Sequence, residues 1–320
     1  MDQYTAETQQ WLDERYRLAT DDGIFFAHQN IYGFQARLLQ TTLHGKPSAY
    51  AEPGAVMRYV VFWSIIKALK TLDFDSVLDV GGAEGYMSGA FRAFFAARVR
   101  SCDLSGEACK RAEEIFNVDA DTVDGVSLPY PDAAFDVVVC SESLEHIPDY
   151  ENVLQELLRV ARKAVIVTVP HDGPEAVART LREKTPHGHL HDFTLDTFND
   201  ILPAPCRVQA LGHNSSWMKL PFRLIEGVPL DVGSRPGVKA PFVKLLNLLI
   251  PMCRFFMNEL AFKLALNLDA VFSNTFKSYR GVIYIISKDP SAFCNDSRHA
   301  NVNTHAVLNY KVPLYRMNPR

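Results

Sequence analysis

Between residues 76 and 170, strand-like and helix-like segments alternate, and this alternation constrains the fold more than any other feature of the sequence. Amphipathic helical segments with short connections separate the strand-like segments. In chain order, the strand-like segments read SVLDV, RVRSCDLS, DADTVDG, FDVVVC and AVIVTVP. Such alternation is typical of a parallel sheet wrapped by helices. We therefore predict an α/β protein built on one central, mostly parallel sheet.

Two further strands extend the predicted sheet. They read CRVQALG at 206–212 and RGVIYIIS at 280–287, and the insertion of roughly 70 residues between them is far longer than an ordinary connection. Before the alternating region, AVMRYVVFWSIIKALKTL places apolar residues at helical spacing. We divide the chain into five predicted parts: an N-terminal helical cap at 1–72, the core at 73–212, a helical insertion acting as a lid at 213–280, the last core strand at 281–288, and a polar, loosely ordered tail at 289–320.

Composition and charge narrow the class of protein. Hydrophobic residues make up 48% and charged residues 22% of the 320 residues, which is ordinary for a globular protein. The net charge is −4, so we do not expect long nucleic acid as a partner. Six cysteines are scattered without a CxxC pair, which indicates neither a disulfide framework nor a cysteine zinc site. The polar, acidic N-terminus lacks the pattern of a signal peptide, and we expect a cytoplasmic protein.

The segment FVKLLNLLIPMCRFFMNELAFKLALNL at 242–268 is strongly apolar. Lys244, Pro251, Arg254 and Lys263 interrupt it, and its longest uncharged run is too short to span a bilayer. Three interpretations stay open: a lid or core over an apolar pocket, a homodimer surface, or peripheral membrane contact. We favour the lid or core, because apolar helices are usually buried.

A glycine cluster follows the first strand-like segment. In VLDVGGAEG, Asp79, Gly81, Gly82 and Gly85 lie between a strand and a helix, where the chain turns sharply and a ligand approaches the backbone. The N-terminus of the following helix can face the polar end of that ligand. Asp103 ends the next strand, about 20 residues on, where a carboxylate accepts hydrogen bonds from ribose hydroxyls. These residues predict a nucleotide-like cofactor.

Four sequence blocks together resemble the class I S-adenosylmethionine-dependent methyltransferases, in particular methyltransferase domains of types 11 and 12. They are VLDVGGAEG, SCDLS, DGVSLPYPDAAFDVVVCSESLEHIPD and HGHLHDFTLDTF. The resemblance covers residues 76–212, with a final strand near 282. It implies a Rossmann-like fold with a seven-stranded sheet and S-adenosylmethionine as cofactor. Ala83 departs from the pattern, since many members have glycine there.

The resemblance also implies which residues bind the cofactor. Asp79 and the glycine turn would hold its methionine part, Asp103 its ribose, and Asp124 would lie by the adenine. The full implied set is Asp79, Gly81, Gly82, Gly85, Asp103, Leu104, Asp124, Gly125 and Ser141.

The stretch SESLEHIPD follows the FDVVVC strand, at the edge where open α/β sheets bind ligands. If this stretch is helical, Glu142, Glu145 and His146 share one face. His146 could then act as a general base toward an acceptor hydroxyl. Alternatively, the two carboxylates and the imidazole suit Mg²⁺, Mn²⁺ or Zn²⁺.

The spacing resembles Glu-x-x-Glu-His in small-RNA terminal 2′-O-methyltransferases, which add a downstream histidine, and in ubiquinone-pathway O-methyltransferases. His189 or His191 stands at the comparable place in HGHLHDFT. The catalytic candidates are thus His146 and His189, and the metal candidates are Glu142, Glu145, His146 and His191. His171 is a further candidate for acceptor contact. The alternative is a wall of the cofactor site with a structural histidine, which is common in class I methyltransferases.

We expect methyl transfer to a hydroxyl of a small-molecule, glycan or lipid-like acceptor. The aromatic segment FFAHQNIYGF and the apolar segment 242–268 suggest a covered, partly apolar pocket. O-methylation is preferred because a candidate base or metal site is present. Three alternatives stay open: a metal-assisted RNA-end 2′-O-methyltransferase, a quinone or C-methyltransferase, and a non-catalytic scaffold that binds S-adenosylmethionine.

Overall fold

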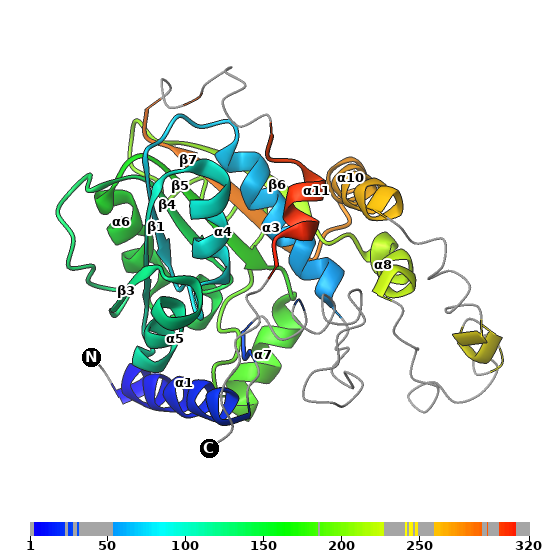
Figure 1. Cartoon of the computed structure of the whole chain (residues 1–320), viewed down its shortest axis with the longest axis horizontal. Helices are drawn as coiled ribbons and strands as arrows, with labels where there is room; N and C mark the ends of the chain where they lie inside the picture. Colours follow the sequence, from blue (N-terminus) through cyan, green and yellow to red (C-terminus); the bar gives the residue numbers. More distant parts are fainter. Residues whose placement is uncertain are drawn as a thin grey trace.

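A computed structural model describes residues 3–22, 25–27, 31, 54–184, 186–226, 241, 243–245, 247–248, 259–289, 293 and 301–311 (Figure 1). One seven-stranded sheet forms the middle layer, in the order β3-β2-β1-β4-β5-β7-β6. Strands β1 to β5 pair in parallel, whereas β7 runs antiparallel to both β5 and β6. This confirms the predicted mostly parallel sheet. The strands are β1 (Ser76–Val80), β2 (Arg98–Asp103), β3 (Asp119–Thr122), β4 (Phe135–Ser141), β5 (Ala161–Pro170), β6 (Arg207–His213) and β7 (Gly281–Ser287).

The strands send alternate side chains into two separate cores. In β4, Val137 and Val139 belong to one buried cluster, whereas Val138 and Cys140 belong to the other. Helices α3 (Ala55–Leu69), α4 (Tyr86–Phe95) and α10 (Glu259–Thr275) contribute to the first cluster, and α6 (Tyr150–Val160) contributes to the second. Because helices cover both faces, the central strands are apolar throughout rather than alternating with polar residues.

Side-chain caps begin two of the helices beside the sheet. The Ser105 hydroxyl accepts a hydrogen bond from the Ala108 N–H at 3.1 Å at the start of α5 (Gly106–Phe116). The Asp149 carboxylate accepts one from the Asn152 N–H at 3.2 Å at the start of α6. Such caps satisfy backbone donors that the helix leaves free. The other elements are α1 (Gln3–Asp22), η1 (Leu144–His146), α7 (Pro174–Glu183), η2 (Ser216–Met218), α8 (Lys219–Glu226) and α11 (Thr304–Asn309).

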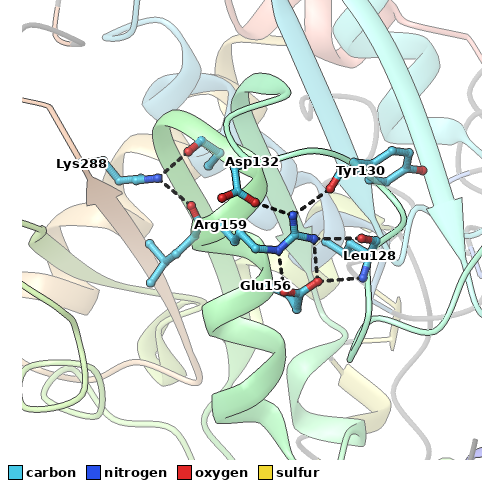
Figure 2. Close-up of polar contacts among 8 residues, drawn as sticks. Leu128, Tyr130, Asp132, Glu156, Arg159 and Lys288 are labelled. Atoms are coloured by element: carbon cyan, nitrogen blue, oxygen red, sulfur yellow. Dashed lines mark hydrogen bonds and ion pairs between the residues drawn. The ribbon is translucent and has the colours of Figure 1, made fainter.

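Arg159 of α6 fixes the loop between β3 and β4, which carries Asp124. Its guanidinium donates hydrogen bonds to the carbonyl oxygens of Leu128 and Tyr130, at 2.9 and 2.8 Å (Figure 2). Glu156, on the preceding turn, accepts hydrogen bonds from Arg159 and from the Leu128 N–H. Charge-assisted hydrogen bonds of this kind are strong and directional. These hydrogen bonds therefore hold the loop against α6.

The C-terminal region differs from the predicted loosely ordered tail. Helix α11 lies within it, and Val302 and Val307 are buried, with 5% and 0% exposure. The Tyr310 ring packs against the rings of Phe94 and Tyr86 of α4. The prediction missed this because polar residues dominate the segment and only a few apolar side chains anchor it.

The predicted insertion begins with η2 and α8 and ends with α10. Residues 227–240 lie outside the described residues, as do residues 242, 246 and 249–258 of the apolar 242–268 segment. Helix α10 packs against β6, η2 and α3. Among the described helices, none is long and apolar enough to cross a membrane.

Candidate functional site

A cavity of about 460 Å³ opens at the carboxyl ends of β1, β2 and β4. Strand β1 lies between β2 and β4. The chain passes from β1 to β2 and β3 on one side and then crosses to β4 on the other side, and ligands of open α/β sheets bind where the strand order reverses in this way. Helix α1 covers the cavity, which it lines with Tyr4, Thr5, Thr8, Leu12 and Tyr16. No described residue of 213–280 lines it. The lid function of that segment therefore stays a prediction.

The glycine turn lies at the cavity floor, where close packing requires the absence of side chains. The N–H groups of Gly81 and Gly82 donate to the Cys102 carbonyl at 2.8 and 3.1 Å. A Cβ on Gly81 would lie 2.1 Å from Ser143 Oγ, and one on Gly82 would lie 2.1 Å from Ser101 Oγ. Gly81 also has φ +73°, which glycine adopts without strain. Both residues line the cavity.

Gly85 belongs to helix packing rather than to the cavity wall. It precedes α4 with φ +84°, and a Cβ there would lie 2.7 Å from Ala112 Cβ of α5. Gly85 is absent from the cavity lining. Glycine is needed here for the approach of α4 to α5, and the role of Gly85 in cofactor binding stays a prediction.

Asp79 lines the cavity at the end of β1 with a buried carboxylate. The Ser88 hydroxyl donates to its Oδ2 at 2.5 Å. Burial raises the pKa of Asp79 to about 6, and the hydrogen bond from Ser88 opposes that rise. The carboxylate is thus oriented but carries a solvation penalty that a ligand donor or cation would relieve.

Asp103 lines the cavity at the end of β2, and the backbone fixes its carboxylate. Its two oxygens accept hydrogen bonds from the N–H groups of Ala83 and Ser105, both at 2.9 Å. Burial raises the pKa of Asp103, while these two hydrogen bonds lower it. The neighbouring Leu104 also lines the cavity, and its carbonyl accepts a hydrogen bond from Gln9 of α1 at 2.9 Å.

Three further predicted cofactor residues also line the cavity. Asp124 and Gly125 come from the loop after β3, and Ser141 ends β4. The Asp124 carboxylate accepts a hydrogen bond from the Val126 N–H at 3.2 Å, which closes a local turn. Ser141 Oγ lies 2.8 Å from Thr168 Oγ1 of β5. Apart from Gly85, the structure brings the whole predicted set to one cavity.

The stretch that follows β4 is not the α-helix expected from the spacing of its acids. Glu142 has φ +53°, and only Leu144–His146 forms a short 3₁₀ turn, η1. The Glu142 N–H donates to the Thr168 carbonyl at 2.7 Å, so this residue still follows the sheet. Glu142 Oε2 lies 3.9 Å from Arg58 Nη1 of α3. Glu142 therefore has Arg58 as its charge partner and lies beside the group of Glu145, His146 and His189 without belonging to it.

Glu145, His146 and His189 form a compact cluster at the cavity wall. One ligand atom from each lies within 4.8 Å of the other two. Glu145 is 1% exposed, and its Oε1 lies 3.7 Å from His146 Nε2. Its Oε2 accepts no hydrogen bond from another described residue. Burial, and then the neighbouring Glu142, raises the pKa of Glu145 well above its ordinary value.

The hydrogen bonds of His146 define which ring nitrogen carries its proton. Its Nδ1 lies 3.2 Å from the Gly188 carbonyl, which can only accept, so Nδ1 is the donor. The ring stacks on His187 with centroids 3.7 Å apart. Burial and the neighbouring His187 and His189 lower the pKa of His146 to about 2. His146 is therefore neutral at physiological pH, with a lone pair on Nε2.

His189 pairs with Asp172, a residue that the sequence analysis did not single out. His189 Nδ1 donates a hydrogen bond to Asp172 Oδ2, and this bond is the main cause of the lowered pKa of Asp172. With Nδ1 occupied, the other nitrogen, Nε2, can accept a proton or ligate a metal. The position of Asp172 just after β5 is the signal that could have found it, because strand ends meet at this edge.

Two predicted histidines lie elsewhere. His191 Nε2 is 2.9 Å from the Ile147 carbonyl, and the ring packs against Tyr150. His191 lies outside both the cluster and the cavity lining, so its role as a metal ligand stays a prediction that these contacts do not support. His171 Nδ1 lies 2.9 Å from the Phe193 carbonyl and does not line the cavity.

A buried ion pair ties the N-terminal segment to the glycine turn. Glu84, inside GGAEG, accepts hydrogen bonds from the N–H groups of Phe26 and Ala27, and its Oε2 lies 3.4 Å from Arg111 Nη2. Both charged side chains are buried, with 0% and 4% exposure. Phe26 and Ala27 line the cavity. Glu84 thus links the floor of the cavity to its cover.

Arg58 is the only lysine or arginine among the described residues that line the cavity. Its side chain is 40% exposed. It can therefore contact a ligand in the cavity in addition to its contact with Glu142. It therefore gives the cavity wall one positive group.

Comparison with known proteins identifies the core. Residues 78–169 match the methyltransferase domain family Methyltransf_11. The chain is 34% identical over 95 residues to 27-O-demethylrifamycin SV methyltransferase of Amycolatopsis mediterranei (strain S699), covering 28% of this chain and 35% of that protein. Residues 78–169 are a methyltransferase domain of the S-adenosylmethionine-dependent class. The chain thus spans only about a third of the length of that relative.

Other relatives of the methyltransferase domain differ in the atom that they methylate. Norajmaline N-methyltransferase of Rauvolfia serpentina is 29% identical over 117 residues, covering 33% of this chain and 40% of that protein. The solved structure of geranyl diphosphate C-methyltransferase from Streptomyces coelicolor A3(2) has a TM-score of 0.50 at 13% identity, covering 90% of this chain and 98% of that chain. That likeness shows the fold alone, and the acceptor is not defined by these relatives.

Proposed function

We propose that this protein transfers a methyl group from S-adenosylmethionine to a hydroxyl of a small-molecule, glycan or lipid-like acceptor. The observation that carries the proposal is that His189, hydrogen-bonded to Asp172, lines the same cavity as the cofactor-type residues Asp79 and Asp103. An imidazole held by a carboxylate is suited to remove a hydroxyl proton.

The residues around the cavity fit S-adenosylmethionine. A volume of about 460 Å³ lies in the range of ligand sites. The fixed carboxylate of Asp103 would accept hydrogen bonds from the ribose hydroxyls, and Asp79 would face the charged methionine end. Asp124 would lie by the adenine. When bound, S-adenosylmethionine supplies an electrophilic methyl group on a sulfonium.

The roles of the chain's own residues follow from their hydrogen bonds. Asp172 keeps the Nδ1 proton of His189 in place, so that Nε2 accepts the proton of the acceptor hydroxyl. His146 donates to the Gly188 carbonyl and holds the loop that carries His189. Helix α1 lines the cavity and would shield a bound methyl donor and acceptor from water. Arg58 would attract an acceptor with an anionic group.

A divalent metal is the second candidate, and the cluster of Glu145, His146 and His189 supports it. One carboxylate and two imidazoles with converging ligand atoms suit Zn²⁺ or Mn²⁺. Both histidines use Nδ1 for a hydrogen bond, which is the usual arrangement of metal-bound histidine. A metal here would activate an acceptor hydroxyl directly and would occupy Nε2 of His189, so the two candidates exclude one another.

Binding and turnover measurements separate these possibilities. Calorimetry with S-adenosylhomocysteine should show binding that Asp103→Ala abolishes; absence of binding would contradict the cofactor assignment. Acceptors of four classes, phenolic polyketides, glycosides, hydroquinones and RNA ends, are then screened for transfer of a labelled methyl group. His189→Gln should abolish transfer without changing S-adenosylhomocysteine affinity.

The same assay with EDTA decides how the hydroxyl is activated. Full activity in EDTA supports His189 as base, whereas loss of activity that Mn²⁺ or Zn²⁺ restores supports the metal. Transfer to RNA ends or to carbon would replace the proposed acceptor class by one of the alternatives. Binding of S-adenosylhomocysteine without transfer to any class would favour a non-catalytic scaffold.

A further inference from the structure

The outer face of α10 exposes a continuous apolar stripe. Leu260, Leu264, Leu268 and Val271 are 61%, 52%, 46% and 52% exposed. At about 100° per residue these side chains fall within an arc of about 80° on one side of the helix. The opposite side of α10, with Phe262 as an example, is buried in the core. A helix that covers a core normally presents a polar outer side, so this stripe requires an explanation.

Neighbouring elements extend the stripe into a larger surface. Helix α10 packs against η2 and α8, which expose Trp217 (68%) and Leu220 (41%), and Phe276 after α10 is 61% exposed. Figure 1 shows α8 and α10 next to one another at the end of the molecule remote from β3. Single exposed leucines are ordinary, but contiguous apolar surfaces mark contact sites. We call this surface the α8–α10 face: Trp217, Leu220, Leu260, Leu264, Leu268, Val271 and Phe276.

The charges around the α8–α10 face have one sign. In residues 216–226 and 260–280, the exposed charged side chains are Lys219, Lys263, Lys277 and Arg280. The two acids in the same segments, Glu226 and Asp269, are buried, with 3% and 1% exposure. The whole chain nevertheless has a net charge of −4. Arg280 also interacts with Asp172. Lys219, Lys263 and Lys277 are therefore the positive groups that lie on or next to the elements with the exposed apolar side chains.

We propose that the α8–α10 face binds the surface of an anionic lipid bilayer. Exposed Trp and Leu side chains would enter the boundary between headgroups and acyl chains, while the flanking lysines contact lipid phosphates. Trp217 suits this boundary because its indole has an apolar body and one polar N–H.

The charge pattern favours a bilayer over a second copy of the chain. A two-fold dimer through this face would place the face against itself. It would bring Lys219, Lys263 and Lys277 toward the same lysines of the other copy, with no exposed acid in these segments to pair with them. An anionic lipid surface supplies the opposite charge. The exposed Leu245 and Leu248, at 53% and 71%, belong to the neighbouring apolar sequence and add to the same chemistry.

The proposal does not depend on methyl transfer. None of the residues of the α8–α10 face lines the main cavity. Lipid binding and cofactor binding can therefore be measured independently on the full-length protein, and failure of one does not imply failure of the other.

Co-sedimentation with vesicles tests the face. The protein should bind vesicles of phosphatidylcholine that contain phosphatidylglycerol, and bind pure phosphatidylcholine vesicles more weakly. Leu264→Glu combined with Val271→Glu should lower binding at least about tenfold, because two exposed apolar contacts become anionic. Lys263→Gln should lower it about fivefold, and added salt should lower it further.

Leu181→Glu on α7 is the matched control, because Leu181 is 54% exposed and lies on another element. This variant should bind vesicles like the wild type, and circular dichroism should show that all variants are folded. Absence of binding to phosphatidylglycerol vesicles would overturn the proposal, as would wild-type binding by the Leu264→Glu/Val271→Glu variant. A dimer that this variant disperses, with no vesicle binding, would assign the face to self-association.

Discussion

The cavity wall carries two histidines whose protons are placed by different partners. His146 Nδ1–H donates a hydrogen bond to the carbonyl of Gly188, and His189 Nδ1–H donates one to the carboxylate of Asp172. A carboxylate stabilises an imidazolium, whereas a carbonyl does so weakly. Burial keeps His146 neutral, since its pKa is lowered to about 2. Of the two rings, His189 is therefore the one that we propose as the base.

Replacing Asp172 tests this assignment at the level of one hydrogen bond. Asp172→Asn removes the charge that stabilises protonated His189, so turnover should fall by about 10²-fold or more. Affinity for S-adenosylhomocysteine should stay within about twofold, because Asp172 does not line the cavity. Steady-state kinetics and calorimetry on the same preparation measure the two quantities.

Asp172→Glu and Glu175→Gln serve as controls. The first retains a carboxylate and should recover part of the activity that Asp172→Asn loses. The second removes an exposed acid from the start of nearby α7 and should have no effect. Equal losses in all three variants would show that Asp172 acts only on the local structure.

His213, at the end of β6, provides a test of pH-dependent stability away from the main cavity. Burial lowers its pKa to about 4, and the neighbouring Lys67 acts in the same sense. In the unfolded chain its pKa is about 6.5. Between these values the unfolded state takes up a proton that the folded state does not, so His213 reduces stability as the pH falls.

The comparison with His213→Asn isolates this effect. From pH 6.5 down to about pH 4, the free energy of unfolding of the wild type should fall relative to the variant by up to about 1.4 kcal/mol per pH unit. Asp269, whose pKa burial raises to about 6, acts in the opposite sense in both proteins and cancels in the difference. Urea unfolding at a series of pH values measures this. A difference that does not change with pH would contradict the prediction.

At the scale of elements, the cover of the cavity depends on the buried Glu84–Arg111 pair. Arg111→Met leaves a buried carboxylate without its cation, which should cost about 3–5 kcal/mol of unfolding free energy. It should also weaken S-adenosylhomocysteine binding, because Glu84 holds Phe26 and Ala27 at the cavity.

Glu84→Gln combined with Arg111→Met should be more stable than Arg111→Met alone. The glutamine keeps an acceptor for the two N–H groups and leaves no buried charge. Chemical denaturation and calorimetry measure both effects. A double variant as unstable as the single one would show that the charge is not the cause.

The elements and the site were predictable to different extents. The continuous apolar strands predicted the parallel sheet, and because parallel strands end at one edge, Asp79, Asp103 and Ser141 were expected together. The conformation of Glu142 was not predictable, because a positive φ in a non-glycine residue has no sequence signal here. Asp172 lies before α7 and His187 lies after it. Local sequence patterns do not define how the connections on either side of α7 bring these two residues to the site.

At the scale of the whole molecule, the two proposed binding surfaces lie on different parts of the sheet. The cavity lies at β1, β2 and β4, whereas the α8–α10 face lies beside β6 at the end of the strand order. Helix α3 connects them, since Arg58 lines the cavity and α3 also packs against α8 and α10. A bilayer bound at this face would place the cavity at a defined position relative to lipid-like acceptors.

The C-terminal segment joins these parts, and its removal tests how far the core depends on it. Helix α11 packs against α3 and α10, and Lys70, directly after α3, donates a hydrogen bond to the Val302 carbonyl at 2.6 Å. Deletion of 301–320 would expose the apolar surface that Val302 and Val307 cover. Each fully buried valine contributes about 1.5–3 kcal/mol, so the free energy of unfolding should fall by about 2–5 kcal/mol.

Val307→Ala should lower the free energy of unfolding by about 1–2 kcal/mol, because it removes two buried methyl groups without shortening the chain. S-adenosylhomocysteine affinity should be retained in both proteins, since no residue of 301–311 lines the cavity. Chemical denaturation followed by calorimetry on the folded fraction measures both quantities. If the deletion left the free energy of unfolding unchanged, α11 would not contribute to the stability of the core. A loss of stability with intact cofactor binding would instead show that the C-terminal segment supports the α3–α10 side of the core, where the proposed lipid face lies.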